Sequence, residues 1–244
     1  MEEVVVFILL TMPLRQSTLQ HYFQPVATKD PCIDLVAAID IGIHNMAIAV
    51  VAADRSTNTI VDVPVLERTD ITVFPCRKRN WPGGCHTNCP LHHSNTMTDW
   101  VAHYVHSLRS ILDKCKVVLI ERQPPGGFRC AEQLLFNHLR EKAILVAPQS
   151  IHHYYYTRTL SYNDRKKRMV AIVQNRLVSI PTVSRVFDKG GKSDERLHDL
   201  ADALLIAYYY VATTMSHPPP NAPGVEMKCD LESSNPFKKW TLAR

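Results

Sequence analysis

The first half of the chain carries short apolar runs separated by polar or glycine-containing segments. Leu35–Val51 is dense in Ile, Val and Ala, with Gly42 near its middle, and Thr59–Val65 and Asp70–Phe74 are two further β-rich runs. Because β-branched and aliphatic residues in such runs favour strands, we predict a meander of strands between residues 35 and 74.

The second half alternates helical and strand patterns. A helix should begin near Thr96, where Thr96 and Asp99 form a plausible capping pair ahead of apolar residues at helical spacing. Val117–Ile120 is a continuous apolar run that ends at Glu121, as expected of a strand buried on both faces. We predict a strand at Ala143–Ala147 and three further helices at Ala131–Glu141, Asp164–Val178 and Arg196–Thr213.

This order of elements predicts an α/β fold in which helices cover a mixed sheet. The length of 244 residues suits one such domain. We place it at residues 32–213, with a Cys- and His-rich insertion at residues 76–93. Residues 1–31 are interpreted as a flexible N-terminal arm and residues 214–244 as a flexible tail, because both are polar or rich in proline.

Charge and composition narrow the class of partner. The net charge is +5, and residues 158–196 hold ten Lys or Arg against four Asp or Glu. Such a segment favours phosphate contacts, although many basic segments are only solvated faces. The apolar run Val4–Leu10 is too short to span a bilayer, and the seven cysteines, an odd number, argue against a closed disulfide framework. We therefore expect an intracellular protein with no membrane association.

Four acidic residues interrupt apolar elements. Asp40 and Glu121 lie in or directly after apolar runs, and Asp199 and Asp202 are three residues apart in an apolar helix, where they share a face. Each acid alone has a structural explanation, but four acids at one site repel unless hard divalent cations bind them. We therefore predict Mg²⁺ or Mn²⁺ at this site, an arrangement that suits phosphodiester hydrolysis by an oriented water.

The order of the segments Ile39–Gly42, Ile120–Gln123 and Asp199–Ala203 resembles the RuvC branch of the RNase H-like superfamily and the poxvirus-type Holliday junction resolvases. The similarity spans about residues 35–212. It implies an RNase H-like mixed five-stranded sheet flanked by helices. It also implies a homodimer that cleaves four-way DNA junctions by paired nicks during recombination, repair or replication, with the four acids as metal ligands.

The resemblance further implies a basic residue between the glutamate and the final acid pair. Lys166 and Lys167 both fit this position, and we name Lys167 as the candidate catalytic lysine, which would stabilise phosphate charge. A solvated helix start is the alternative explanation of both lysines. The candidate DNA-binding residues are Arg122, Arg165, Lys166, Lys167 and Arg168.

The insertion is rich in residues that bind zinc. Three cysteines and three histidines fall within 18 residues, at Cys76, Cys85, His86, Cys89, His92 and His93. The spacing of Cys85, Cys89 and a histidine three residues further on is compatible with a structural zinc ion. We name Cys76, Cys85, Cys89 and His92 as its preferred ligands, with a reduced, metal-free loop as the alternative.

The N-terminal arm contains a short motif, Gln16–Phe23, that resembles the PCNA-interacting peptide of replication and repair enzymes. Leu19, Tyr22 and Phe23 can form one face of a helical turn that fills an apolar pocket of a sliding clamp, with Gln16 anchoring its start. Docking of this turn on the protein's own core is the alternative.

Three functions are compatible with these motifs. The first is a junction resolvase, and the second is an RNase H or flap-type nuclease with the same acidic site. The third is a catalytically inactive protein that binds nucleic acid and the clamp. The clamp motif leads us to expect the protein at a site of DNA replication, in a nucleus or a viral replication compartment.

Overall fold

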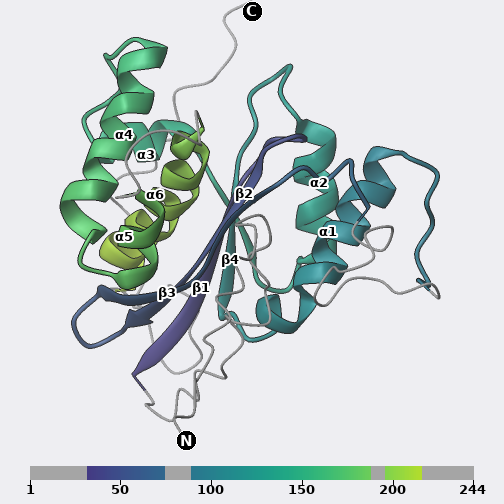
Figure 1. Ribbon diagram of the computed structural model, residues 1–244, viewed down its shortest axis with the longest axis horizontal. Coiled ribbons are helices and arrows are strands. Elements are labelled where there is room, and N and C mark those ends of the chain that lie inside the picture. The colour runs from purple at the N-terminus through teal and green to yellow at the C-terminus, as the bar shows by residue number, and fades with distance from the viewer. Residues whose placement is uncertain (1–31, 75–88, 188–195, 216–244) are drawn as a thin grey trace, which may run out of the picture.

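The computed structural model describes residues 32–74, 89–187 and 196–215 (Figure 1). The described strands form one five-stranded sheet in the order β3-β2-β1-β4-β5. Antiparallel pairing joins β1 to β2 and β2 to β3, whereas β4 is parallel to both β1 and β5. The predicted α/β fold with a mixed five-stranded sheet is therefore confirmed. The strands are β1 (Ile33–Asp40), β2 (Met46–Asp54), β3 (Thr59–Thr69), β4 (Val117–Glu121) and β5 (Ala143–Val146).

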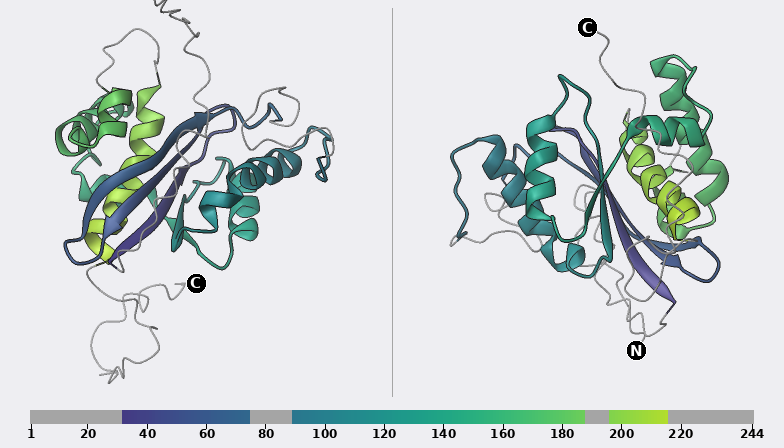
Figure 2. Two further views of the ribbon diagram at one scale, coloured as in Figure 1. Left: turned by 60° about the horizontal axis from the view of Figure 1, so that its bottom comes forward. Right: turned by 180° about the vertical axis from the view of Figure 1, so that it is seen from behind.

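Helices cover both faces of the sheet, with α1 and α2 on one face and α3 to α6 on the other (Figures 1 and 2). The almost wholly apolar α6 packs across β1, β2 and β3, and α4 packs against α6. In the described ranges, no helix is long and apolar enough to cross a membrane. The helices are α1 (Met97–Leu112), α2 (Arg129–His138), α3 (Pro148–Tyr154), α4 (Tyr162–Leu177), α5 (Pro181–Phe187) and α6 (Leu197–Thr214).

Alternate residues of the central strands belong to two separate cores. In β1, Val36 and Ala38 pack in the core beneath α6, whereas Ala37 and Ile39 pack in the core with α1 and α2. The side chains of β4 alternate between the two cores in the same way. Successive side chains of a strand point to opposite faces of a sheet, so the continuous apolar runs of β1 and β4 supply both cores at once.

The turn between β1 and β2 requires a glycine. A Cβ atom added to Gly42 would lie 3.0 Å from the backbone oxygen of Asn45. This close approach explains why a glycine lies in the middle of the long apolar run. The run forms a hairpin of two strands, β1 and β2, rather than one strand.

Two local predictions are wrong. The predicted strand at Asp70–Phe74 is a turn, because the Asp70 carboxylate accepts hydrogen bonds from the backbone N–H and the hydroxyl of Thr72, at 2.9 and 2.6 Å. The predicted capping pair does not form either. Thr96 is the N-cap residue of α1 but makes no side-chain capping bond, and Asp99 accepts hydrogen bonds from the backbone N–H and hydroxyl of Ser94, each at 2.5 Å.

The short helices α3 and α5 were not predicted from the sequence. Each begins with a proline, Pro148 in α3 and Pro181 in α5. Proline is favoured at the first helical position, because an N–H group there has no partner within the helix. The two prolines were therefore the signal that identifies both helices.

Candidate active site

Two of the predicted acids lie side by side at the carboxyl edge of the sheet. In the parallel pair β1–β4, Ile39 is opposite Ile120, so Asp40 and Glu121 follow at neighbouring positions. The alternation along each strand turns both carboxylates toward the face covered by α6.

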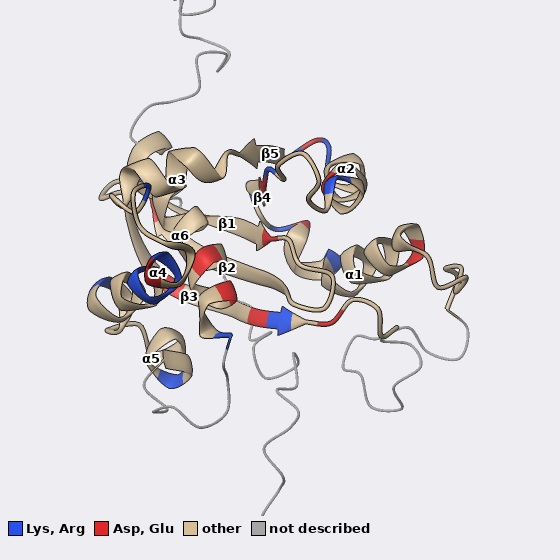
Figure 3. Cartoon of the chain, turned by 90° about the horizontal axis from the view of Figure 1, so that it is seen from above, with Lys and Arg blue, Asp and Glu red and all other residues tan. Residues whose placement is uncertain are grey.

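The other two acids come from the start of α6. Asp199 is in its first turn and Asp202 one turn further on, as their spacing of three residues predicted. Asp40, Glu121, Asp199 and Asp202 all line one cavity of about 610 Å³. The structure therefore brings together the four predicted acids from three separate elements, next to the basic residues of α4 (Figure 3).

Burial and mutual repulsion shape the charge of this cavity. Burial raises the pKa of Asp40 well above its usual value, and the neighbouring carboxyl groups of Glu121 and Asp202 raise it further. Burial also raises the pKa of Asp202, although the nearby Lys166 ammonium opposes this rise. The folded protein thus holds carboxyl groups where their charged forms are unfavourable, a cost that bound cations remove.

The structure places Lys166, rather than Lys167, among the acids. Lys166 forms an ion pair and a hydrogen bond with Asp202. Burial lowers the pKa of Lys166, but Asp202 and Asp40 outweigh this effect and the net pKa is raised, so the ammonium stays charged. Lys167, our candidate from the sequence, is exposed and does not line the cavity. Of the two lysines considered from the sequence, Lys166 is therefore the one that lies at the cavity.

The flanking residues Arg165 and Tyr162 also line the cavity. The Tyr162 ring lies 5.7 Å from the Arg165 guanidinium carbon and 5.6 Å from Lys166 Nζ. Tyr162 is 59% exposed, so the rim of the cavity presents an aromatic face beside two positive charges. Arg122 and Arg168, the other candidates for DNA binding, are exposed and do not line the cavity.

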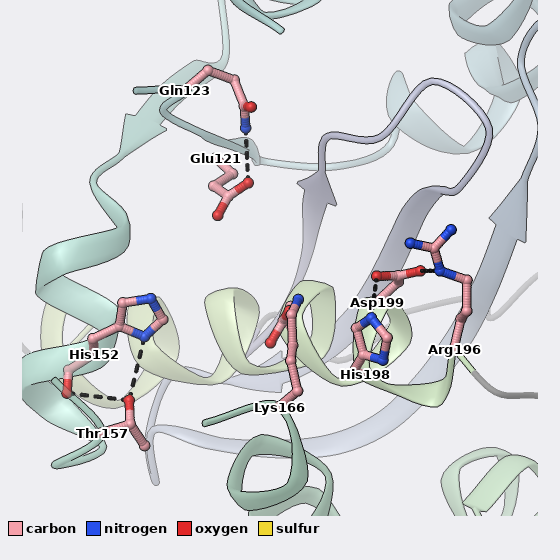
Figure 4. Close-up of polar contacts among 9 residues, drawn as sticks. Glu121, Gln123, His152, Thr157, Lys166, Arg196, His198 and Asp199 are labelled. Carbon is pink, nitrogen blue, oxygen red and sulfur yellow. Dashed lines mark hydrogen bonds and ion pairs between the residues drawn. The ribbon is translucent and has the colours of Figure 1, made fainter. Parts of the chain in front are cut away.

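Asp199 is held by its neighbours on the chain (Figure 4). One carboxylate oxygen, Oδ1, lies 3.1 Å from His198 Nε2, and the other, Oδ2, lies 3.4 Å from Arg196 Nε. Oδ2 is buried and accepts no hydrogen bond from the described residues. A buried carboxylate oxygen with unused acceptor capacity fits a role as a ligand of a hard cation.

The four carboxylates do not all lie close together. Among the described residues, no three of the four acids place oxygen atoms within 4.8 Å of one another. Asp202 is instead paired with Lys166. The donor set, four carboxylates at one cavity, still suits Mg²⁺ or Mn²⁺ better than a soft metal.

Gln123 positions Glu121 and was not among the site residues predicted from the sequence. Its side-chain amide donates a hydrogen bond to Glu121 Oε2 at 2.8 Å (Figure 4). Its own backbone N–H donates to the buried Glu132 at 2.5 Å. A Cβ atom on Gly127 would lie 3.0 Å from Gln123 Oε1, so the glycine leaves room for this side chain. The signal was the polar Gln123 two residues after an acid at a strand end.

Cys89 and His92, the described members of the predicted zinc ligand set, do not line this cavity. Cys89 groups with His93 and His103, whereas the side chain of His92 is exposed. His103, which lies on α1, was absent from our predicted ligand set. Cys76, Cys85, the N-terminal motif residues and residues 216–244 of the predicted tail lie outside the described residues.

No protein-family model and no curated protein sequence matches the chain. Solved structures do match it. The fowlpox virus resolvase in complex with Holliday junction DNA has a TM-score of 0.50 at 18% identity, covering 73% of this chain and 97% of that one. The yeast mitochondrial Holliday junction resolvase Ydc2 has a TM-score of 0.52 at 17% identity, covering 73% of this chain and 78% of that one. The chain therefore shares the RNase H-like fold of these resolvases.

Proposed function

We propose that this protein is a divalent-metal-dependent endonuclease that resolves four-way DNA junctions by paired nicks. The observation that carries the proposal is the meeting of Asp40, Glu121, Asp199 and Asp202 in one cavity, with Lys166 beside them. The fold supports the substrate class, because the solved proteins that share it are Holliday junction resolvases and one of them is bound to junction DNA.

The chemistry follows from the residues of the cavity. The four acids would hold Mg²⁺ or Mn²⁺, which supplies Lewis acidity and eases deprotonation of a water. The Lys166 ammonium is placed to stabilise negative charge that develops on a phosphate. Gln123 fixes the orientation of Glu121.

Binding of the substrate would use the rim of the cavity. The guanidinium of Arg165 offers paired donors to backbone phosphates, and the exposed Tyr162 ring offers a surface on which a base can stack. Exposed Lys167 and Arg168 extend the same basic helix and add charge attraction to phosphate.

The test is cleavage with Mg²⁺ of a synthetic four-way DNA junction, a matched linear duplex and an RNA–DNA hybrid. We expect paired, symmetric nicks in the junction alone, and a loss of at least about 10²-fold in Asp199→Asn, the scale for removing one charge-stabilising group. Asp113→Asn, at an exposed acid after α1, is the matched control and should keep full activity.

The other outcomes identify the competing functions. Cleavage of the hybrid instead of the junction would indicate an RNase H. Junction binding without cleavage, with either Mg²⁺ or Mn²⁺, would indicate a catalytically inactive binding protein.

We also propose that the N-terminal motif binds a PCNA-like sliding clamp, which would bring the nuclease to sites of DNA replication in a nucleus or viral replication compartment. The support is the pattern of Gln16, Leu19, Tyr22 and Phe23. Clamp binding by the full chain should be lost in the double variant Tyr22→Ala, Phe23→Ala. Binding that survives both substitutions would overturn this proposal.

Paired nicking leads us to propose a homodimer, since two active sites are needed to face two strands. Light scattering should give twice the chain mass of 27.7 kDa for the active protein. An active monomer would exclude the dimer.

A further inference from the structure

A second cluster of ligand-type side chains lies on the other face of the sheet. Cys89, His93 and His103 place one Sγ and two imidazole nitrogens within 4.8 Å of one another. Cys89 and His93 precede α1, whereas His103 is on that helix. None of the three lines the acidic cavity, so this cluster is separate from the candidate active site.

A hydrogen bond sets the tautomer of His103. Its Nε2 lies 3.1 Å from the backbone oxygen of His92. A carbonyl oxygen can only accept, so Nε2 must carry the proton, and in the neutral ring Nδ1 then carries the lone pair. A histidine that donates one ring N–H to a carbonyl oxygen and presents its other nitrogen is the usual arrangement of a metal-binding imidazole.

The surroundings hold the cluster in place. His103 has no exposed surface, and its ring centroid lies 4.5 Å from that of His93 and 4.6 Å from that of Phe74. The chain entering α1 is tied down by the two hydrogen bonds from Ser94 to Asp99. The buried His103 ring is therefore held in a fixed position beside two residues of types that bind metals.

The donor types match zinc. One thiolate and two imidazoles are borderline-soft donors that zinc prefers, and around a tetrahedral zinc ion such atoms lie about 3.4–3.6 Å apart, given its bond lengths. The three ligand atoms lie within 4.8 Å of one another, and small side-chain rotations can bring them to that distance. The acidic cavity, in contrast, offers only oxygen donors from its carboxylates.

We propose that Cys89, His93 and His103 bind one structural zinc ion that ties the segment before α1 to that helix. The ion would link two residues before α1 to one residue within it, and so hold the preceding segment against the helix. Three protein donors leave one tetrahedral position for a fourth ligand. This assignment is independent of the proposed nuclease function.

The first test is the metal content of the full-length protein, purified without added metal and dialysed against weak chelator. We expect about one zinc per chain, and a wild type without stoichiometric zinc would overturn the proposal. X-ray absorption at the zinc edge should show sulfur at about 2.3 Å and two imidazole nitrogens at about 2.0 Å. A shell of oxygen alone would exclude this ligand set. Neither measurement depends on whether a variant folds.

Matched variants test the individual ligands. Zinc content should fall from about one to near zero in Cys89→Ser, His93→Gln and His103→Gln. It should stay unchanged in three controls: Cys130→Ser, at an exposed cysteine on α2; His92→Gln, at the exposed neighbour of His93; and His106→Gln, at an exposed position on α1. Loss of zinc in His92→Gln with retention in His93→Gln would overturn the assignment.

The proposed ion also predicts a change in stability. Removal of zinc with a chelator that does not bind Mg²⁺ should lower the Tm of the wild type, because a ligand of the folded state stabilises it. His103→Gln should have the lower Tm without chelator and show no further shift with it. An unchanged Tm in the wild type would argue against a structural ion.

Discussion

The two faces of the sheet are built from the same strands but carry different polar groups. Beneath α6, the apolar alternation of β1 and β4 ends in two acids: Asp40, which lies near other charged groups, and Glu121, which accepts a hydrogen bond from the Gln123 amide. Against α1 and α2, the alternation ends in apolar side chains, and the ligand-type residues nearby are a thiol and two imidazoles. A single sheet thus separates a cavity that contains four carboxylates from a cluster of one thiol and two imidazoles.

The largest effect should come from the lysine on the charged face. Lys166→Gln removes the ammonium next to Asp202, and junction cleavage should fall by about 10²- to 10³-fold, the scale for losing one preorganised charge-stabilising group. Lys167→Gln, the adjacent and exposed lysine on the same helix, should change cleavage little. Single-turnover rates at saturating protein measure both. An equal loss in the two variants would mean that α4 contributes general charge rather than a placed group.

A smaller effect is expected from the residue that positions Glu121. Gln123→Leu keeps most of the side-chain volume but removes the hydrogen bond to Glu121. A hydrogen bond to a charged group contributes about 1.5–3 kcal/mol, so kcat should fall by about tenfold or more, with a rise in the Mg²⁺ concentration needed for half the maximal rate. Gln174→Leu, at an exposed position of α4, is the control. An unchanged Mg²⁺ requirement would show that Gln123 does not act through Glu121.

Ionisation of the buried Asp40 should also lower the free energy of unfolding in a pH-dependent way. The pKa of Asp40 is raised by burial and by the neighbouring acids, so ionising it costs more in the folded than in the unfolded chain. This cost is absent below the ordinary carboxyl pKa, grows as the pH rises and is complete above the raised pKa.

In buffer with EDTA, Asp40→Asn should therefore have a higher Tm than wild type at pH 8, by about 2–4 °C for each kcal/mol recovered. The difference should shrink toward pH ~4, near the ordinary carboxyl pKa. Thermal unfolding across this pH range, with Asp113→Asn as the control, measures it. A difference that grows toward low pH would contradict the raised pKa.

The smallest effects compare one tyrosine on each face. The Tyr104 hydroxyl, in the core with α1 and α2, is buried and has no hydrogen-bond partner among the described residues. The Tyr155 hydroxyl, in the core with α6, donates to the Leu205 carbonyl oxygen at 3.0 Å. Tyr155→Phe should lower the free energy of unfolding by about 0.5–1.5 kcal/mol, whereas Tyr104→Phe should leave it unchanged or raise it slightly. Denaturant unfolding distinguishes the two, and equal losses would mean that Tyr104 is also hydrogen-bonded.

Much of the fold was predictable because apolar periodicity is a local property. The boundaries of α1, α4 and α6 and the buried strand β4 agree with the sequence patterns to within two residues. Where side-chain hydrogen bonds with the backbone overrode the apolar pattern, as at Asp70, the prediction failed. The four acids were identifiable because each one interrupts an apolar element, where a charge is costly unless a partner or a metal ion compensates it.

Other features depend on how distant elements pack, and no local pattern contains them. Lys166 and Lys167 are adjacent in a basic run, but a helix turns by about 100° per residue, so they point in different directions. Which of the two faces the acids of α6 depends on how α4 packs against α6. Lys166 does precede the buried Met169 by three positions, which was a usable hint. His103 lies beside Cys89 and His93 because α1 packs next to the segment that precedes it. The spacing of residues within the insertion could not indicate a ligand that lies outside it. The sequence thus specified which chemical groups are present, whereas the packing of helices on the two faces of the sheet decided which of these groups lie in contact. The reason is that contacts between distant segments arise only when the cores form.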